Sequence, residues 1–310
     1  MSFTLKPGRS IRRELRRIAR KELGRAATRL SEGHRSDGDI HESRKSVKKV
    51  EAVITLLEEI GAAPRRKVVK RLRGVRRTLS QIRDARAIVE TYDRLRARFS
   101  HRIPEHTSAI VRSQFTHRKT LLMARAKART IDDTGRALRN IRRSVKQWPL
   151  KSIKPSGLPW LIRQSYRAGR KKMFRAQLRA RASDFHQWRK EVKNLWYQLR
   201  LMERLAAGMS KQIAEFGELE TALGEEHNLS VLRDKLRGDR SLRRLKTQSE
   251  DVAAMSTARE EELRRAALVL GTRLYRMTPK AFEKDLEQRL RPKGVPRRRR
   301  PSRSDRHAVA

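Results

Sequence analysis

The sequence predicts an all-α protein built from two similar helical bundles. Apolar residues return every three or four positions along nearly the whole chain, which is the period of an amphipathic helix. Alternating polar and apolar runs bounded by turn pairs, which would indicate strands, do not occur in the sequence. The second half of the chain also repeats patterns of the first. Together these observations predict two pseudo-symmetric four-helix bundles.

The expected helices are rich in Arg, Leu, Ala, Glu and Lys, and prolines fall between them. In chain order we expect helices over residues 9–31, 39–60, 65–98, 105–146, 160–181, 184–206, 210–237, 247–276 and 280–290. Three prolines between Trp148 and Pro159 interrupt the helical pattern, which predicts a linker. The expected organisation is a first half at 1–147, a Pro-rich linker at 148–159, a second half at 160–290 and a tail at 291–310.

The charge of the chain is strongly positive throughout. The 310 residues include 79 Lys and Arg against 34 Asp and Glu, a net charge of +45. Residues 291–310 contain eight basic residues, one acid and three prolines, which predicts a disordered basic tail. The tail's net +7 leaves +38 on the first 290 residues. Self-repulsion on this scale calls for an anionic partner.

Several classes of protein are excluded by composition. The chain has no cysteine, so it contains no disulfide, Cys-bound zinc site, iron–sulfur cluster or reactive thiol. The basic N-terminal region is not followed by the apolar run of a secretory signal. Apolar stretches such as Ala266 to Leu270 are too short to span a bilayer. We therefore expect a soluble, cytoplasmic chain without a membrane span.

Two sequence elements occur in both halves. Residues 39–50 read DIHESRKSVKKV, and residues 184–195, at an offset of 145, read DFHQWRKEVKNL. A second pair follows at an offset of 144, with LSQIRD at 79–84 and LGEEHN at 223–228. Two matches in the same order, at offsets agreeing to one residue, indicate an internal duplication.

The repeated helix carries basic residues on one face. On a helical projection, basic residues share a face with the histidine, and apolar residues such as Val47, Val50, Val192 and Leu195 share the other. The basic stripes are His41, Arg44, Lys45 and Lys48 in the first half, and His186, Arg189, Lys190, Lys193, Tyr197, Arg200 and Arg204 in the second. Like charges at i and i+4 destabilise a helix. Their repetition favours an anion-binding surface over a solvated one.

The opening helix of each half adds further arginines and completes the candidate site. They are Arg12, Arg13, Arg16 and Arg20 in the first half, and Arg163, Arg167 and Arg170 in the second. Two basic helices per half, facing across a groove, would form a channel for a linear polyanion, because Arg forks and Lys point charges both bind phosphate oxygens. Asp39 and Asp184, two residues before the histidines, are expected to cap the helix N-termini.

The duplicated His-x-x-Arg-Lys-x-x-Lys helix, followed by the Leu-x-x-x-(Arg/His)-(Asp/Asn) element, resembles the CHAD domain, the conserved-histidine α-helical domain. The resemblance covers roughly residues 10–280. It implies two four-helix bundles around a basic central cavity that binds inorganic polyphosphate without catalysis. It assigns binding to His41, Arg44, Lys45, Lys48 and Lys49, and to His186, Arg189, Lys190 and Lys193.

This chain departs from the family pattern in three places. Ser80 stands where a glycine is expected, Asn228 stands opposite Asp84, and Asn194 replaces the second lysine of the Lys48-Lys49 pair. We expect positions 80 and 228 to shape a helix junction and not to hold the ligand. The repeated Glu-x-Glu-x-Lys motif of the triphosphate-hydrolysing domain found in many relatives is missing from the sequence, so the chain resembles a stand-alone member.

No motif in the sequence indicates catalysis, a cofactor or a metal site. The histidines have no tight metal spacing, and no phosphate-binding glycine loop occurs. We therefore expect a binding protein, not an enzyme. Surrounded by cations, His41 and His186 should be neutral when the site is empty and become charged when a polyanion fills it.

Two alternatives remain open on the sequence alone. A generic nucleic-acid or polyanion binder would also be basic, although aromatics make up only 5% of the chain and no nucleic-acid-binding motif occurs. The tail could still contact nucleic acid weakly. A structural protein of polyphosphate or polyhydroxyalkanoate granules is the other alternative. The sequence contains no signal for a particular oligomeric state.

Overall fold

The computed structural model describes residues 3–31, 36–100, 105–125, 128–150, 155–238 and 246–290. The basic tail at 291–310 lies outside the described residues, as do the short segments between these ranges. The described residues are all-α, as predicted, and include no strand. Their helices are α1 (Ile11–Arg29), α2 (Asp37–Glu58), α3 (Arg66–Arg98), α4 (Glu105–Arg125), α5 (Ala128–Ser144), α6 (Leu158–Arg179), α7 (Ala182–Met202), α8 (Ser210–Gly238), α9 (Lys246–Leu274) and α10 (Pro279–Leu290).

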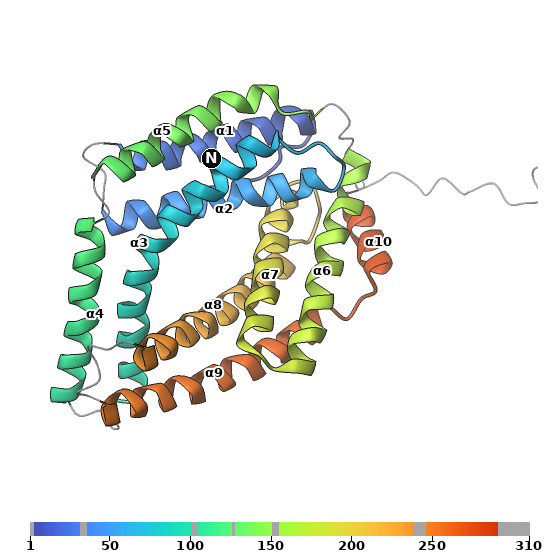
Figure 1. The fold of residues 1–310 in the computed structure, drawn as a ribbon. Helices are drawn as coiled ribbons and strands as arrows, with labels where there is room; N and C mark the ends of the chain where they lie inside the picture. Colours follow the sequence, from blue (N-terminus) through green and yellow to red (C-terminus); the bar gives the residue numbers. More distant parts are fainter. Residues whose placement is uncertain are drawn as a thin grey trace, which may run out of the picture.

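The expected helix at 105–146 is wrong, because the structure has two helices there. α4 and α5 run in different directions (Figure 1). Each follows a different partner, since α4 packs on the second half of α3 while α5 packs on α1. Tyr92 of α3 is buried against α4, where its hydroxyl donates to Ser108 Oγ at 3.2 Å. These different partners, and not helix propensity, set the directions of α4 and α5.

The predicted linker region is partly helical and partly buried. A short 3-10 turn at Val145–Gln147 follows α5, and a second at Pro155–Gly157 precedes α6. Trp148 and Leu150 are buried in the core between them. α6 begins at Leu158, with Pro159 in its first turn, where a missing N–H costs nothing.

The buried apolar side chains form two cores, and each core draws on both halves of the sequence. The larger core joins residues such as Leu15 and Val53 to Trp188 and Phe216. The smaller joins α3 and α4 to α8 and α9. Direct bonds also cross between the halves, such as the Leu5 N–H that donates to the carbonyl of Leu201 at 2.8 Å.

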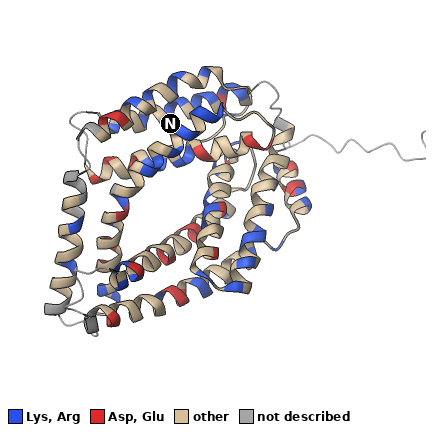
Figure 2. Ribbon diagram, in the orientation of Figure 1, with Lys and Arg blue, Asp and Glu red and all other residues tan. Residues whose placement is uncertain are grey.

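Four helices frame the middle of the molecule. In Figure 1, α2, α3, α8 and α7 form the four sides, with α1 and α5 above α2, α9 beside α8, and α6 beside α7. Lys and Arg occur on every described helix (Figure 2), so overall charge alone does not locate a site. The contacts of individual side chains locate the candidate site.

Candidate functional site

The two repeated helices, α2 and α7, pack directly on each other. The predicted apolar faces are buried, including Val47 and Val50 of α2 and Val192 and Leu195 of α7. Gln198 of α7 is also buried and donates from Nε2 to the carbonyl of Ala52 at 3.4 Å. Burying the apolar sides in a shared core leaves the basic stripes of both helices on neighbouring surfaces.

The expected helix caps are wrong at both aspartates. α2 is capped by Ser36, whose side chain accepts from the Asp39 N–H, while the Asp39 carboxylate accepts from the Ser36 N–H at 3.2 Å. Asp39 is therefore the reciprocal member of a capping box. Asp184 lies inside the first turn of α7, buried, and pairs with Arg175 at 2.7 Å. Both carboxylates still lie at a helix N-terminus, where negative charge is favourable.

Cationic side chains from three of the framing helices converge on one place, which we call the basic cluster, and the fourth helix, α8, adds a histidine and a carboxylate. Its cations are Arg44 and Lys48 of α2, Arg83 of α3, and Arg189 and Lys193 of α7. Three histidines accompany them, namely His41, His186 and His227. Three carboxylates pair with these cations, Asp84 and Glu90 on α3 and Glu220 on α8. The five cations outnumber these carboxylates by two.

In the first half, side chains of α3 contact the basic stripe of α2. The Nε of Arg44 donates to Ser80 Oγ at 3.0 Å, and its Nη2 lies 3.7 Å from Asp84 Oδ1. The Nε of Arg83 donates to His41 Nδ1 at 2.9 Å, so Nδ1 is unprotonated and the neutral ring carries its proton on Nε2. Arg83 thereby orients the histidine.

In the second half, α8 contacts the stripe of α7 in a corresponding way. The His227 ring lies against the His186 ring, with centroids 4.2 Å apart. A Cβ on Gly224 would lie 3.5 Å from Arg189 Nε, so the glycine lies directly beside this arginine. Glu220 accepts hydrogen bonds from both Lys193 and Arg189, the latter at 3.5 Å.

The second repeated sequence element therefore belongs to the site. Positions 80 and 224 each contact the stripe arginine, and positions 83 and 227 each contact the stripe histidine. The expectation that positions 80 and 228 shape a helix junction is wrong, because both lie in the middle of long helices, α3 and α8. Arg83 and His227 are site residues that the sequence assignment missed, although their alignment was a usable signal. Glu220 had no such signal, because the position aligned with it is Arg76.

The cations of the two halves are close enough to affect each other's ionisation. Burial, and then the proximity of Lys193, Arg44 and Arg189, lowers the pKa of Lys48 well below its ordinary value. Burial likewise lowers the pKa of Arg44, against the opposing effect of Asp84 and with the help of Arg189. Like charges from α2 and α7 therefore face each other across the contact between the halves.

The histidines of the cluster are held neutral. Burial, followed by Lys190, Arg189 and Lys48, lowers the pKa of His186 to about 4. Burial, followed by His186 and Arg189, lowers the pKa of His227 to about 3. The pKa of His41 is also lowered, by burial and then by Arg83. The prediction that these imidazoles are neutral in the empty site is confirmed for His41 and His186.

Three buried nitrogen atoms in the cluster have no hydrogen-bond partner within the described part of the chain. They are the donors Arg83 Nη1 and Arg189 Nε, and the ring nitrogen His186 Nδ1. Leaving a buried donor unsatisfied costs about 1–3 kcal/mol, more for a charged group. An anion with several oxygens would satisfy such donors while neutralising the surrounding charge.

Other predicted residues of the repeated helices lie at the margin of this cluster. Lys45 and Lys190 are exposed, Lys45 pairing with Glu42 at 2.7 Å and Lys190 lowering the pKa of the nearby His186. Lys49 points to α1, where it pairs with Glu22 at 3.3 Å.

Tyr197 and Arg200, at the far end of the second stripe, belong to the packing of α7. Tyr197 is 3% exposed and packs on Phe3. Arg200 lies over the ring of Trp196, 4.9 Å from its centroid.

The arginines of the opening helices make contacts away from the cluster. Arg16 donates to the carbonyl of Trp148 at 2.7 Å, and Arg170 donates to that of Tyr275 at 3.1 Å. Arg163 pairs with Glu283 of α10 at 2.5 Å. The remaining four are surface residues without a described contact to the cluster: Arg12 is half-buried, and Arg13, Arg20 and Arg167 are exposed. α1 and α6 thus support the site helices and hold their own arginines elsewhere.

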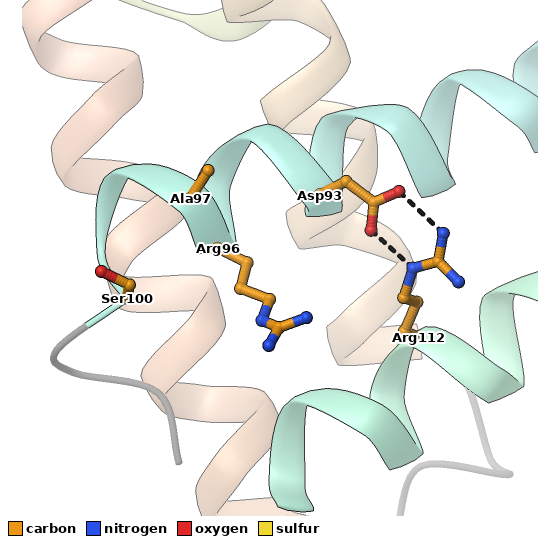
Figure 3. Close-up of a pocket in the computed structure, with 5 residues that line it drawn as sticks. All are labelled: Asp93, Arg96, Ala97, Ser100 and Arg112. Carbon is orange, nitrogen blue, oxygen red and sulfur yellow. Dashed lines mark hydrogen bonds and ion pairs between the residues drawn. The ribbon is translucent and has the colours of Figure 1, made fainter. Parts of the chain in front are cut away.

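A pocket of about 580 Å³ between α3 and α4 is a poorer candidate (Figure 3). Its cations already have partners, since Arg112 pairs with Asp93 through two bonds of 2.7 and 3.1 Å and Arg96 lies 3.3 Å from Glu105. Within the described ranges, no three His, Asp or Glu residues are grouped to hold a metal ion. In the same ranges, no helix is both long and apolar enough to cross a bilayer.

An all-helical frame that concentrates cations and unsatisfied donors has the features of an anion-binding protein. The chain belongs to the CHAD domain family, whose profile matches residues 17–237. That family is linked in general to polyphosphate binding. The structure is similar to the crystal structure of the CHAD domain from the plant Ricinus communis, with a TM-score of 0.63, 16% identity, and coverage of 92% of this chain and 94% of the plant chain. At that identity the likeness shows the fold. A search of curated sequences finds no match.

Proposed function

We propose that this protein binds inorganic polyphosphate at the basic cluster, without catalysing its breakdown or synthesis. The single observation that carries the proposal is the convergence of Arg44 and Lys48 with Arg189 and Lys193, from the two copies of the repeated helix, on one partly buried place. Membership of a family linked to polyphosphate supports the same ligand.

The chemistry of the cluster matches a chain of phosphates. Arginine forks and lysine ammonium groups donate to phosphate oxygens, and the free positions on Arg83 and Arg189 add donors that protein acceptors leave unused. The side chains are between 15% and 22% exposed for the four cations Arg44, Arg83, Arg189 and Lys193, so their charges are poorly screened by solvent. A thin, highly charged chain can approach side chains at this depth more easily than a nucleic acid with its bases.

Within this proposal the protein acts in the cytoplasm, and association with polyphosphate granules would follow from the same site. The basic tail adds attraction of lower specificity, because eight basic residues in a proline-containing segment contact any phosphate backbone. Generic binding of nucleic acid is the competing function. The two functions differ in how binding depends on polymer type and on the cluster.

The test compares long-chain polyphosphate, single-stranded RNA and duplex DNA at a near-physiological and a higher salt concentration. It uses the full chain, a variant without residues 291–310, and the variant R44A/K48A/R189A/K193A. The matched control, K70A/R71A/R139A/K146A, removes the same number of arginines and lysines from exposed positions on α3, on α5 and in the 3-10 turn after α5. Circular dichroism confirms that each variant is helical.

We expect polyphosphate to bind most tightly, the cluster variant to lose about a hundredfold or more in affinity, and the control to lose a few-fold. Four lost phosphate contacts should also flatten the salt dependence of binding. Equal affinity for all three polymers, with equal losses in the cluster variant and the control, would refute the proposal in favour of generic polyanion binding.

A further inference from the structure

Glu220 is an unusual residue in the basic cluster, because it is a carboxylate deep among cations. Its side chain is 13% exposed, and its Oε1 accepts from Lys193 Nζ and from Arg189 Nη2. The Lys48 ammonium of α2 is also close enough to influence it. Glu220 therefore faces cations of both halves. Burial raises its pKa, but Lys193 and Arg189 outweigh burial, so the net pKa is lowered and the group is ionised.

The corresponding place in the first half has no such carboxylate. The residue aligned with Glu220 is Arg76, which pairs with Glu51 at 2.9 Å. The carboxylate nearest Arg44 is Asp84, which is 3.7 Å away and 57% exposed. Solvent weakens that pair, whereas it has little access to the pairs of Glu220. In the first half Glu90 also pairs with Arg83 at 2.9 Å, but Glu90 is 30% exposed, so the most buried carboxylate paired with the cluster cations is Glu220.

The donors that Glu220 occupies are the ones that a phosphate group would use. Lys193 and Arg189 belong to the repeated stripe, and a carboxylate and a phosphate compete for the same N–H groups. We propose that Glu220 is a resident counter-anion that stabilises the empty cluster and that an incoming polyanion must displace from Lys193 and Arg189. This inference rests on the proposed function and assigns a determinant of affinity to that site.

The inference has two opposite consequences for one substitution. Removing the negative charge of Glu220 leaves Lys48, Arg189 and Lys193 facing each other, so the ligand-free protein loses stability. The same change frees donors and raises the net positive charge of the cluster, so polyphosphate binds more tightly. A residue with a purely structural role would lower stability without improving binding.

The experiment measures the melting temperature without ligand and the Kd for long-chain polyphosphate at fixed salt, in the full chain. E220Q keeps the size and shape of the side chain and removes its charge. The matched control is E283Q, because Glu283 is 16% exposed and pairs with Arg163 between α6 and α10, outside the cluster. E220D, which retracts the carboxylate by one methylene, provides a charged variant that keeps the fold if E220Q is too unstable to purify.

We expect E220Q to melt at a lower temperature than the wild type and to bind polyphosphate about tenfold more tightly. E220D should shift Kd in the same direction by less, and E283Q should lower the melting temperature without changing Kd. Unchanged or weaker binding by E220Q and E220D would overturn the inference while R44A/K48A/R189A/K193A still loses binding. If that cluster variant binds as the wild type does, the proposed function fails instead.

Discussion

The depressed pKa values of the paired histidines predict that polyphosphate binding takes up a proton. His186 and His227 are neutral in the empty cluster, surrounded by Lys48, Arg44, Arg189 and Lys190. A bound polyanion cancels this positive field and accepts hydrogen bonds from a protonated ring. The bound state should therefore favour the imidazolium, and affinity should rise as the pH falls.

The magnitude follows from the pKa of His186. If the ligand returns that pKa from about 4 to its ordinary value of 6.5, the histidine remains neutral in the free protein at pH 5.5 but is mostly charged in the complex. The association constant then rises about tenfold between pH 7.5 and 5.5, since one pKa unit corresponds to ~1.4 kcal/mol. The rings of His186 and His227 are only 4.2 Å apart, so repulsion limits the pair to about one proton.

The assay is a titration with long-chain polyphosphate at pH 7.5 and 5.5 at constant ionic strength. Long chains have few terminal phosphates, so titration of the ligand contributes little. Calorimetry in two buffers with different ionisation enthalpies counts the protons taken up on binding. In H186Q/H227Q the proton uptake and the pH dependence should both disappear. H41Q should retain both, because Arg83 provides a permanent charge beside His41.

An equal Kd at both pH values in the wild type, with no proton uptake, would refute this reasoning. A pH dependence that persists unchanged in H186Q/H227Q would assign it to other groups. Loss of the pH dependence in H41Q alone would place the titrating group in the first half of the cluster.

Two further predictions concern stability. G271A should lower the melting temperature by several degrees, because the new Cβ would lie 2.6 Å from Trp188 in a close-packed region and overpacking of this kind costs about 1–3 kcal/mol. The control is G74A, which should be neutral or stabilising because its new Cβ would have nothing within 4 Å. Equal melting temperatures for G271A and the wild type would contradict the packing argument. The second prediction concerns Glu260, whose pKa is raised to about 7 by burial. The folded protein therefore retains a proton that the unfolded chain releases near pH 4.5, so the free energy of unfolding should fall as the pH rises from 4.5 to 7. Denaturant unfolding across that range should show a smaller fall for E260Q than for the wild type, and identical pH profiles would refute the assignment.

The helices could be predicted from sequence because each has a continuous apolar stripe. The division of 105–146 into α4 and α5 could not, since the residues around the break are good helix formers. The different directions of α4 and α5 follow from their packing partners, since α4 packs on the preceding helix α3 while α5 packs on α1, far away in the sequence. Likewise, the core shared by both halves depends on long-range packing that periodicity does not encode.

The candidate site, too, could be predicted from the sequence only in part. The repeat identified Arg44, Lys48, Arg189 and Lys193, because duplicated residues on one helical face are visible in a single sequence. The direction in which the arginines of the opening helices point depends on acceptors far away in the sequence, such as the carbonyl of Trp148, which accepts from Arg16. Non-local acceptors of this kind leave no local signal.

The bond between the Leu5 N–H and the carbonyl of Leu201 has a consequence for folding during synthesis. Phe3, on the same segment, packs on Tyr197, so these two contacts need α7 to have been made, whereas the bond from Arg17 to the Thr4 carbonyl needs only α1. At about 5–20 residues per second, the ribosome needs some 10–40 seconds to reach α7 after releasing Leu5. The packing of Phe3 and Leu5 at the beginning of the chain therefore stays incomplete until the second copy of the repeated helix emerges.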